Sequence, residues 1–361
     1  MIKYKQIADT LRSGIQNGSY KQTLPTEQQL CEQFQVSRQT IRQALAVLQS
    51  EKLIERRQGS GSYIRETAEE SSERLSAATP AERLSIAVVT TYISDYIFPG
   101  ILREIESELA ANNSTPLLFA TQNQVATERR ILNTLLEMDV LDGVLVEGTK
   151  TGFPNPNLDL YQKLIDRDIP LVFFHGNYPE LKDTLSVLDD NFAGGEMLVD
   201  YLYQKGHRAI AGIFKSDDIQ GHQRYAGYAA GLHKYGLPFD DSHVLWYDTE
   251  LKRRIFEHYF DPDITSQVIG GCSAVICYND EIAAHVVTGL TQSGIAVPEK
   301  MAVVSFDNSH YSELSVPRIT SLSHGENNVG RQAARTLIRL IRREPCQSLL
   351  VPWVLTEKES S

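Results

Sequence analysis

Two arginines, Arg38 and Arg42, stand four residues apart in the segment VSRQTIRQAL. A guanidinium can donate two hydrogen bonds to one guanine, and a glutamine amide such as that of Gln39 can pair in the same way with adenine. The apolar residues of this stretch recur with helical spacing and are expected to face a core: Ile41, Ala44, Leu45 and Leu48. The arginines and Gln39 are therefore expected on the exposed side of a helix, where they could contact base edges.

This helix is predicted to be the second of a pair. The first begins in LPTEQQL, where Thr26 and Gln29 have the spacing of a capping box. Ser37 can cap the second helix, and an amphipathic helix from Lys5 to Gln16 precedes both. A helix-turn-helix places the N-terminal residues of its second helix against DNA. Taken alone, however, the second helix is better interpreted as a solvated surface helix with two arginines.

A predicted β-hairpin in LIERRQGSGSYI (53–64) favours the DNA-binding interpretation. Two β-prone runs flank a Gly-Ser-Gly turn, and Arg56 and Arg57 lead into it. Such a hairpin can bring its backbone against phosphates or a minor groove. A nucleotide-binding role for Gly59 and Gly61 is not favoured, because no helix follows them to supply an N-terminal dipole. Together these elements predict a winged helix-turn-helix domain of α+β class in residues 1–65.

The charge distribution separates this module from the rest of the chain. Residues 1–65 contain ten Lys and Arg against five Asp and Glu, a net +5, so the other residues carry −16 of a chain whose formal charge is −11. Residues 66–82 are rich in Glu, Ser, Thr and Ala and hold almost no large apolar side chain, which is typical of a linker. A chain of 361 residues is also long enough for more than one core.

Residues 83–361 show repeated βα patterns. The apolar runs lack strict alternation, as in strands buried on both faces of a parallel sheet. They are LSIAVVTTY, TPLLFATQN, DGVLVEGT, PLVFFHGN, RAIAGIF, SAVICYND and MAVVSFDN, and each but the last is expected to be followed by 10–15 helical residues. At least seven strands favour a two-lobed α/β domain with doubly wound parallel sheets over a single sheet.

Other classes of protein are disfavoured by what the sequence lacks. No apolar run approaches a membrane span, and the N-terminus has no signal-peptide core, so a cytoplasmic protein is expected. The four cysteines show neither a CxxC pair nor metal-ligand spacing, so free and mostly buried thiols, no metal and no cofactor are expected. Because hydrolase, Walker and zinc-protease motifs are missing too, an enzyme is not expected.

Residues 1–65 resemble the DNA-binding domain of the GntR family of bacterial repressors. The similar segments are LPTEQQL, VSRQTIRQAL and RRQGSGSYI. The resemblance implies DNA contacts from the start of the second helix, the recognition helix and the wing tip, and a phosphate contact near the N-terminus. Carried over to this sequence, the predicted DNA-binding residues are Lys3, Glu27, Arg38, Gln39, Thr40, Arg42, Gln58, Gly59 and Gly61.

The remainder resembles the sugar-sensing core of LacI-type repressors, which has a periplasmic-binding-protein-like fold. The similar segments include DGVLVEG, LDDNFAGG, KGHRAIAGI and VVSFDNS. TTYISDYIF, GIFKSDDIQG and CYNDEIA are similar in particular to the arabinose repressors of Gram-positive bacteria. Over almost the whole chain apart from the linker, the resemblance therefore implies a homodimeric repressor that binds double-stranded operator DNA and leaves it on binding L-arabinose.

Polar residues at predicted strand ends support a sugar ligand independently. Ligands of open α/β sheets bind beyond the carboxyl ends of the strands. Carboxylates, amides and a guanidinium there could bind hydroxyl groups, and aromatic rings could pack on a sugar face. The predicted effector-binding residues are Tyr92, Tyr96, Glu147, His175, Lys215, Arg224, Asn279, Asp280 and Asp307.

Alternatives remain open for some of these residues and for the ligand. His175 could be a structural histidine, Asp280 could cap a helix, and Asp189-Asp190 could be either a helix cap or part of a hinge. Another pentose, a galactoside or a nucleoside could replace arabinose as the effector. In a different class, a sugar-processing enzyme with a regulatory head is the remaining alternative.

Overall fold

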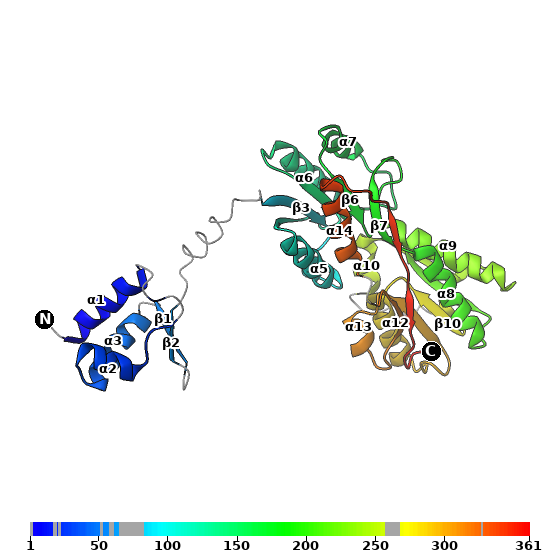
Figure 1. Cartoon of the computed structure of the whole chain (residues 1–361). Helices are drawn as coiled ribbons and strands as arrows, with labels where there is room; N and C mark the ends of the chain where they lie inside the picture. Colours follow the sequence, from blue (N-terminus) through cyan, green and yellow to red (C-terminus); the bar gives the residue numbers. More distant parts are fainter. Residues whose placement is uncertain are drawn as a thin grey trace. The chain divides into compact units, whose positions relative to one another are not determined.

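The computed structural model describes residues 3–16, 20, 23–50, 53–57, 61–64, 83–256, 268–325 and 328–361. The chain divides into two compact units, Met1–Glu82 and Arg83–Ser361, and each is described by itself (Figure 1). No helix in the described ranges is long and apolar enough to cross a membrane. The four cysteines are free; Cys277 is buried, and Cys31, Cys272 and Cys346 are half-buried.

The N-terminal unit is a small helical core with a β-hairpin. Its elements are α1 (Lys3–Gln16), α2 (Glu27–Phe34), α3 (Arg38–Ser50), β1 (Ile54–Arg57) and β2 (Gly61–Ile64). The predicted capping box of α2 is confirmed, because Thr26 and Gln29 bond each other's backbone N–H. β1 pairs antiparallel with β2, and Leu24 N donates to Ser62 O at 2.9 Å, which ties the segment before α2 to the hairpin.

The C-terminal unit, residues 83–361, contains two six-stranded sheets, which we call the N-lobe and the C-lobe. The N-lobe sheet has the order β13-β7-β6-β5-β3-β4. Its strands are β3 (Leu84–Thr90), β4 (Ser114–Ala120), β5 (Gly143–Val146), β6 (Leu171–Phe174), β7 (Leu185–Asp189) and β13 (Leu349–Val351), all parallel. Apolar side chains of α5 (Phe98–Ala111) and α14 (Val329–Ile341) cover one face, and those of α6 (Val125–Glu137) and α7 (Leu158–Asp166) cover the other.

The C-lobe sheet has the order β14-β12-β11-β10-β8-β9. Its strands are β8 (Ile210–Lys215), β9 (Val244–Tyr247), β10 (Ala274–Cys277), β11 (Ala302–Phe306), β12 (Thr320–Ser323) and β14 (Val354–Thr356). Only the β12–β14 pairing of these described strands is antiparallel. The helices are α8 (Asn191–Gln204), α9 (Ile219–Lys234), α10 (Thr249–Phe256), α12 (Asp280–Gln292) and α13 (His310–Leu314), with a short 3-10 turn η1 (Asp241–His243).

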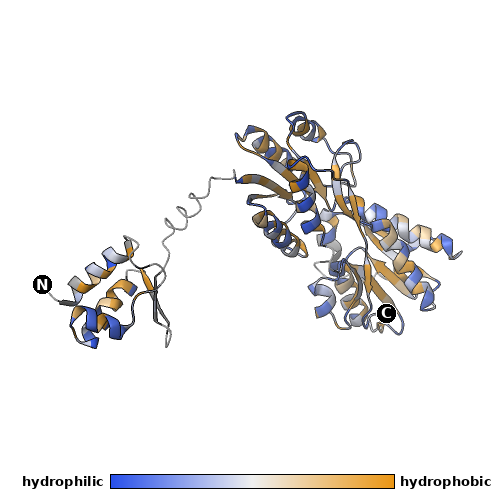
Figure 2. Cartoon of the chain, in the orientation of Figure 1, coloured by the Kyte–Doolittle hydropathy of each residue, from blue (hydrophilic) through white to orange (hydrophobic). Residues whose placement is uncertain are grey.

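The prediction of two doubly wound parallel sheets is confirmed. The strands are the most apolar segments and lie inside the helical layers (Figure 2). The chain passes from one sheet to the other after β7, between β12 and α14, and between β13 and β14. One detail of the prediction is wrong: PLVFFHGN is followed directly by β7 rather than by a helix, because its successor LSVLD pairs beside β6.

Both sheets reverse their strand order at one place, between β3 and β5 in the N-lobe and between β8 and β10 in the C-lobe. At such a point the connections leave the sheet on opposite faces, which opens a crevice at the carboxyl ends of the two strands. The fold thus brings the ends of β3, β5, β8 and β10 into the region where a ligand is expected.

Candidate DNA-binding surface and ligand site

Helix α3 presents its polar residues as the sequence predicted. Ile41, Ala44, Leu45 and Leu48 are buried, which confirms the predicted apolar face. Arg38, Gln39 and Arg42 are exposed, and Thr40 is half-buried. Ser37 caps the helix, since its Oγ accepts from Thr40 N at 3.3 Å and lies 2.9 Å from the Thr40 hydroxyl. The start of α3 is therefore fixed by its cap, and its polar face is free to meet a partner.

Glu27 connects α2 to the two arginines of α3. Its Oε2 lies 3.0 Å from Arg42 Nε and 3.2 Å from Arg38 Nε. The Glu27 side chain is only 17% exposed, whereas those of Arg38 and Arg42 are 67% and 61% exposed. One carboxylate thus orients two guanidiniums and leaves their remaining N–H groups available. This pairing across the two helices was not foreseen from the sequence, which gave Glu27 only as a direct DNA contact.

The wing and the N-terminus are described in part. Arg57 in β1 pairs with Gly61 in β2 at the described end of the hairpin. Gln58 and Gly59 of the predicted contact set lie outside the described residues, while Gly61 is the first residue of β2. Lys3 is the first residue of α1.

In the C-terminal unit, the predicted effector residues gather at the carboxyl ends of strands from both lobes. Tyr92 and Tyr96 follow β3, Glu147 follows β5, and His175 follows β6. Lys215 ends β8, Asn279 and Asp280 follow β10, and Asp307 follows β11; Arg224 lies in α9. Direct hydrogen bonds join the two lobes here, and Tyr96 provides the clearest of them.

Tyr96 of the N-lobe bonds two residues of the C-lobe. Its hydroxyl donates to Asp307 Oδ2 at 2.7 Å and accepts from Asp280 N at 3.2 Å. Burial, with the neighbouring Asp307 carboxylate, raises the pKa of Tyr96 well above its usual value. The phenol therefore stays protonated and keeps donating to Asp307.

Arg224 is the most enclosed cation of the site, with only 2% of the residue exposed. Its Nε donates to Asn191 Oδ1 at 2.9 Å, its Nη1 donates to the Tyr278 carbonyl, and its Nη2 lies 3.3 Å from Asp307 Oδ1. The guanidinium also lies over aromatic rings, 4.2 Å from the Phe306 centroid. Burial lowers the pKa of Arg224, but Asp307, Tyr278 and Asp189 together outweigh it and raise the pKa overall, so the side chain is a fixed positive charge.

His175 belongs to a second network, centred on the Asp189 carboxylate. Its Nδ1 lies 2.9 Å from Asp189 Oδ2, while Gln220 Nε2 donates to the same oxygen at 3.2 Å and to His175 O at 3.1 Å. His324 Nε2 lies 3.0 Å from the other Asp189 oxygen. Burial lowers the pKa of His175, but Asp189 more than compensates and raises the pKa to about 9. With Nδ1 donating to Asp189, the imidazolium has a second donor, Nε2–H, which is buried and has no partner among the described residues.

Glu147 and Lys215 complete the charged groups. Glu147 Oε2 accepts from Thr90 Oγ1 at 2.8 Å, Thr91 N at 2.6 Å and Thr91 Oγ1 at 2.8 Å. Burial raises the pKa of Glu147 despite His175 and these hydrogen bonds, which lower it. Lys215 Nζ donates to Asp218 Oδ2 at 2.6 Å, and its pKa is raised overall because the aspartates outweigh burial.

Asn279 and Asp280 have structural partners in this arrangement. Asn279 Oδ1 accepts from Ile282 N at 3.1 Å and so caps α12, the role that the sequence had suggested for its neighbour. Asp280 is fully buried, and its carboxylate accepts from the hydroxyls of Ser305 and Ser321 and from Ser309 N. Burial, with Asp307, raises the pKa of Asp280 to about 6.

The aspartate pair before α8 divides its roles. Asp190 Oδ1 accepts from Ala193 N at 3.1 Å and caps the helix, whereas Asp189 is the centre of the His175 network at the passage between the lobes. Gln220, Tyr278 and His324 were not foreseen. Gln220 stands in the quoted segment GIFKSDDIQG and Tyr278 in CYNDEIA, so their positions near strand ends were an available signal; His324 follows β12, a strand that was not predicted.

The whole arrangement suits a neutral ligand rich in hydroxyl groups. Lys215 is paired with Asp218 and Arg224 with Asp307, so no cation is left over to demand an anionic ligand, while His175 Nε2–H remains as a donor for a hydroxyl group. Across the described ranges, no three His, Cys, Asp or Glu side chains converge as metal ligands would.

A model for bacterial regulatory proteins of the gntR family matches residues 3–64, and a model for a periplasmic binding protein-like domain matches residues 199–361. The chain is 33% identical over 350 residues to the arabinose metabolism transcriptional repressor of Geobacillus stearothermophilus, covering 94% of this chain and 92% of that protein. It is 32% identical to the repressor of the same name from Halalkalibacterium halodurans, covering 95% and 90%. The crystal structure of the transcription regulator CcpA of Lactococcus lactis superposes with a TM-score of 0.67 at 21% identity, covering 78% of this chain and 100% of that chain.

Proposed function

This chain belongs to the family of arabinose metabolism transcriptional repressors, and we propose that L-arabinose is the effector that releases it from its operator. The protein is a transcriptional regulator that binds DNA and responds to a sugar, and it is not an enzyme. The observation that carries the proposed effector is the meeting of paired donors and acceptors from both lobes at the strand ends, with His175 Nε2–H as an unused donor. The names of the two relatives support arabinose as the sugar.

We assign DNA recognition to residues 1–65 and sugar recognition to residues 83–361, with 66–82 as the connecting linker. On the DNA side the proposed contacts are Lys3, Glu27, Arg38, Gln39, Thr40, Arg42, Gln58, Gly59 and Gly61. The exposure of Arg38 and Arg42 on one side of α3 supports direct base contacts. Because Glu27 already forms ion pairs with both guanidiniums, its proposed part is to orient them as well as to meet DNA.

We assign sugar binding to Tyr92, Tyr96, Glu147, His175, Lys215, Arg224, Asn279, Asp280 and Asp307. Arg224 and Asp307 are the strongest members, since each is buried beside the other and faces Tyr96 from the opposite lobe. Asn279 and Asp280 are the weakest, because their side-chain oxygens accept hydrogen bonds from their own lobe. Closure of the two lobes on the sugar would move the segments that pass between them and so change the spacing of the DNA-binding units.

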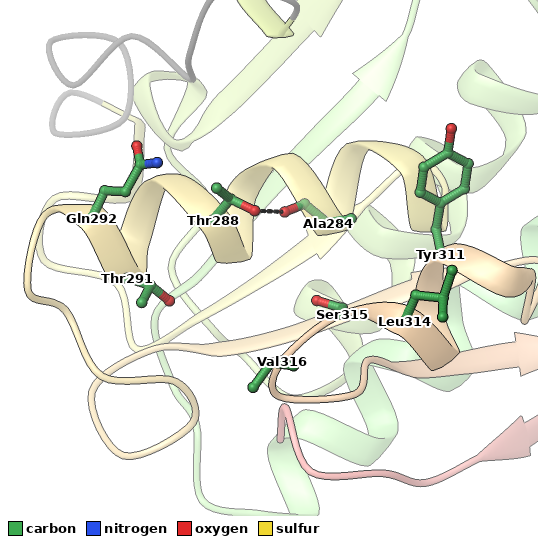
Figure 3. Close-up of a pocket in the computed structure, with 8 residues that line it drawn as sticks. All are labelled: Ala284, Thr288, Thr291, Gln292, Tyr311, Leu314, Ser315 and Val316. Atoms are coloured by element: carbon green, nitrogen blue, oxygen red, sulfur yellow. Dashed lines mark hydrogen bonds between the residues drawn. The ribbon is translucent and has the colours of Figure 1, made fainter.

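We further propose a homodimer on a two-fold symmetric operator, and one face of the C-lobe supports it. A hollow of about 600 Å³ lies between α12 and the segment 311–316, lined by Ala284, Thr288, Thr291, Gln292, Tyr311, Leu314, Ser315 and Val316 (Figure 3). Leu314 is 77% exposed and Val316 85% exposed at its rim. A two-fold axis beside this face would place the Leu314–Val316 projection of each copy in the hollow of the other, which is the reciprocity that a symmetric dimer needs.

The dimer has a simple test. Val316→Asp in the full-length protein is expected to give monomers in analytical ultracentrifugation, since a charge would be buried without a partner. Leu350→Asp changes another exposed apolar residue, 58% exposed on β13, and serves as the control. A dimer that withstands Val316→Asp as well as it withstands Leu350→Asp would place the interface elsewhere.

Calorimetric titration of the full-length protein with L-arabinose tests the effector, with xylose, ribose, galactose and a nucleoside as comparison ligands. Selective binding of arabinose, together with loss of operator binding in a gel shift at the same concentrations, is the expected result. Selective binding of another ligand would keep the repressor and replace its effector. By linkage, the sugar weakens DNA binding by the same factor by which DNA weakens sugar binding, and this reciprocity can be measured in the same titrations.

A further inference from the structure

The two lobes also touch at a second place, which involves none of the proposed sugar contacts. On the N-lobe side it consists of Asn123, after β4, and the segment 150–152, after β5. On the C-lobe side it consists of the segment 216–219, after β8, and Thr249. Gly152 N donates to Asp217 O at 3.1 Å, and Ile219 N donates to Thr151 Oγ1 at 3.0 Å. Two backbone N–H groups, one from each lobe, therefore have their acceptors on the opposite lobe.

Asn123 joins both sides of this contact with one amide group. Its Oδ1 accepts from Lys150 N at 2.9 Å within the N-lobe, and its Nδ2 donates to Thr249 Oγ1 at 2.7 Å in the C-lobe. Nδ2 also lies 3.4 Å from Asp217 Oδ2, which accepts from Thr249 N at 3.1 Å. Asn123 is 1% exposed and Asp217 is fully buried. If the lobes separated, these polar groups would have to exchange protein partners for water.

At Gly152 the backbones of the two lobes lie too close together for a side chain. A Cβ at this position would lie 2.4 Å from Ser216 O and 2.9 Å from Asp217 C, both of them backbone atoms that cannot rotate away. The φ angle of Gly152 is not in the left-handed region, so the conformation itself is open to alanine. Only the distance between the lobes excludes a side chain. An added methyl group would therefore act on the lobe contact and not on the local backbone.

The N-lobe segment that carries Gly152 cannot easily yield. Thr149 O and Thr149 N both lie within hydrogen-bond distance of the Tyr178 hydroxyl, at 2.9 and 2.7 Å. Asn155 Nδ2, just beyond the segment, donates to Glu128 Oε2 at 2.8 Å, and the fully buried Glu128 also accepts from Tyr178 and Tyr161 at 2.7 Å. The segment is held at both ends, so a clash at Gly152 is relieved most readily by moving the lobes apart.

We propose that the contact of Asn123, Thr151 and Gly152 with 216–219 and Thr249 is a latch. This latch sets the fraction of protein molecules in which the two lobes are closed. The latch deepens the proposed function, because a sugar held between the lobes binds with an apparent affinity that falls in proportion to the closed fraction. These residues act as positioning residues: they hold the lobes together and leave the sugar to the strand-end groups. Weakening the latch thus lowers both sugar affinity and the release from DNA that follows, while the DNA-binding residues are unchanged.

Hydrogen exchange of the full-length protein measures the latch directly, since the amides of Gly152 and Ile219 are protected across the lobe contact. Gly152→Ala is expected to accelerate exchange in the peptides that contain residues 152 and 219, with and without L-arabinose. Apparent arabinose affinity is expected to fall ~10-fold, in step with a tenfold fall in the closed fraction. Gly100→Ala is the matched control, because a Cβ at Gly100 meets nothing within 4 Å. It is expected to leave both readouts unchanged.

A second pair of variants keeps the test decisive if Gly152→Ala destabilises the fold. Thr151→Val removes the hydroxyl acceptor of Ile219 N at nearly constant shape and is expected to accelerate exchange at Ile219, whereas Thr151→Ser retains the hydroxyl and should restore protection. Exchange at residues 152 and 219 that matches the wild type in both Gly152→Ala and Thr151→Val would overturn the latch. So would faster exchange with unchanged sugar affinity. If the wild type binds no arabinose but the variants still accelerate exchange, the latch stands and the proposed effector fails.

Discussion

In the N-terminal unit, Arg38 and Arg42 are more than half exposed and meet the rest of the fold through one carboxylate, that of Glu27. In the C-terminal unit, Arg224 is 2% exposed and is bonded to Asn191, the Tyr278 carbonyl and Asp307. In the first arrangement the N–H groups of the arginines face solvent, so they can still contribute binding free energy by donating hydrogen bonds to a partner. In the second arrangement the guanidinium is already removed from water, and its partners within the protein offset the free-energy cost of that desolvation. The two units should therefore respond differently when a functional side chain is removed.

Arg224→Ala is expected to have the largest effect, because it leaves the Asp307 carboxylate, whose side chain is only 7% exposed, without its cation. Breaking a buried pair in this way costs roughly 3–5 kcal/mol of unfolding free energy. Both tryptophans of the chain, Trp246 and Trp353, lie in the C-terminal unit, so urea unfolding of the full-length protein followed by their fluorescence reports on this unit. Sugar response should be lost as well. Arg103→Ala, at an exposed position of α5, is the control, and an equal loss in both variants would refute the internal role of Arg224.

The buried charge of His175 should make the unfolding free energy depend on pH. Its pKa is raised from 6.5 to about 9 in the folded protein, so its contribution to stability is complete below pH 6.5 and is lost as the pH rises through 9. The unfolding free energy is expected to fall by up to about 1 kcal/mol per pH unit in that window. His175→Gln should flatten this slope, whereas His310→Gln, at an exposed position, should preserve it. An unchanged slope in His175→Gln would assign the dependence to another group.

Arg42→Ala tests the opposite case, an exposed cation with little internal role. Operator affinity is expected to fall by about 1–3 kcal/mol, as for loss of a base contact. The unfolding free energy should change by less than about 0.5 kcal/mol, and arabinose binding should not change. Fluorescence anisotropy with labelled operator measures the first, and the control is Gln49→Ala near the end of the same helix. A large loss of stability would show that the simple contrast between the two units fails at Arg42.

The same contrast explains how far the sequence could be interpreted. The structure of the N-terminal unit could be predicted from the sequence because its signals are local. The Thr26 cap, the spacing of Ile41 to Leu48 and the hairpin each lie within a few residues of the element that they determine. The two sheets could be predicted because fully buried strands form continuous apolar runs in the sequence. The direct step from β6 to β7 was missed because β7 carries Ser186 within its apolar run and ends in the polar Asp189.

The contacts between the lobes could not be predicted from the sequence, for a different reason. Asp189 binds His175 and His324 from segments that only the finished fold brings together, and Asn123 reaches Thr249 across two lobes. Nothing in the spacing of these residues indicates the pairing. Residue type and strand-end position predicted which groups could gather, but the partner of each group depends on the angle between the lobes. The local patterns of the N-terminal unit do not depend on the arrangement of distant segments, except at Glu27, whose partners lie on another helix.

Glu27→Gln gives the smallest expected effect and sharpens the comparison most. The neutral amide keeps the size of the side chain but weakens its hold on Arg38 and Arg42, so operator affinity is expected to fall by less than in Arg42→Ala. If Glu27 acts only by orienting the arginines, the loss should be similar for every operator variant and should nearly vanish in an Arg38→Ala, Arg42→Ala background, because coupled residues are not additive. If it also contacts a base, specificity at one operator position should relax and the loss should persist in that background. Anisotropy titrations over a set of single-base operator variants distinguish these results. Persistence would mean that even the exposed arginines share their operator contacts with a carboxylate of the preceding helix.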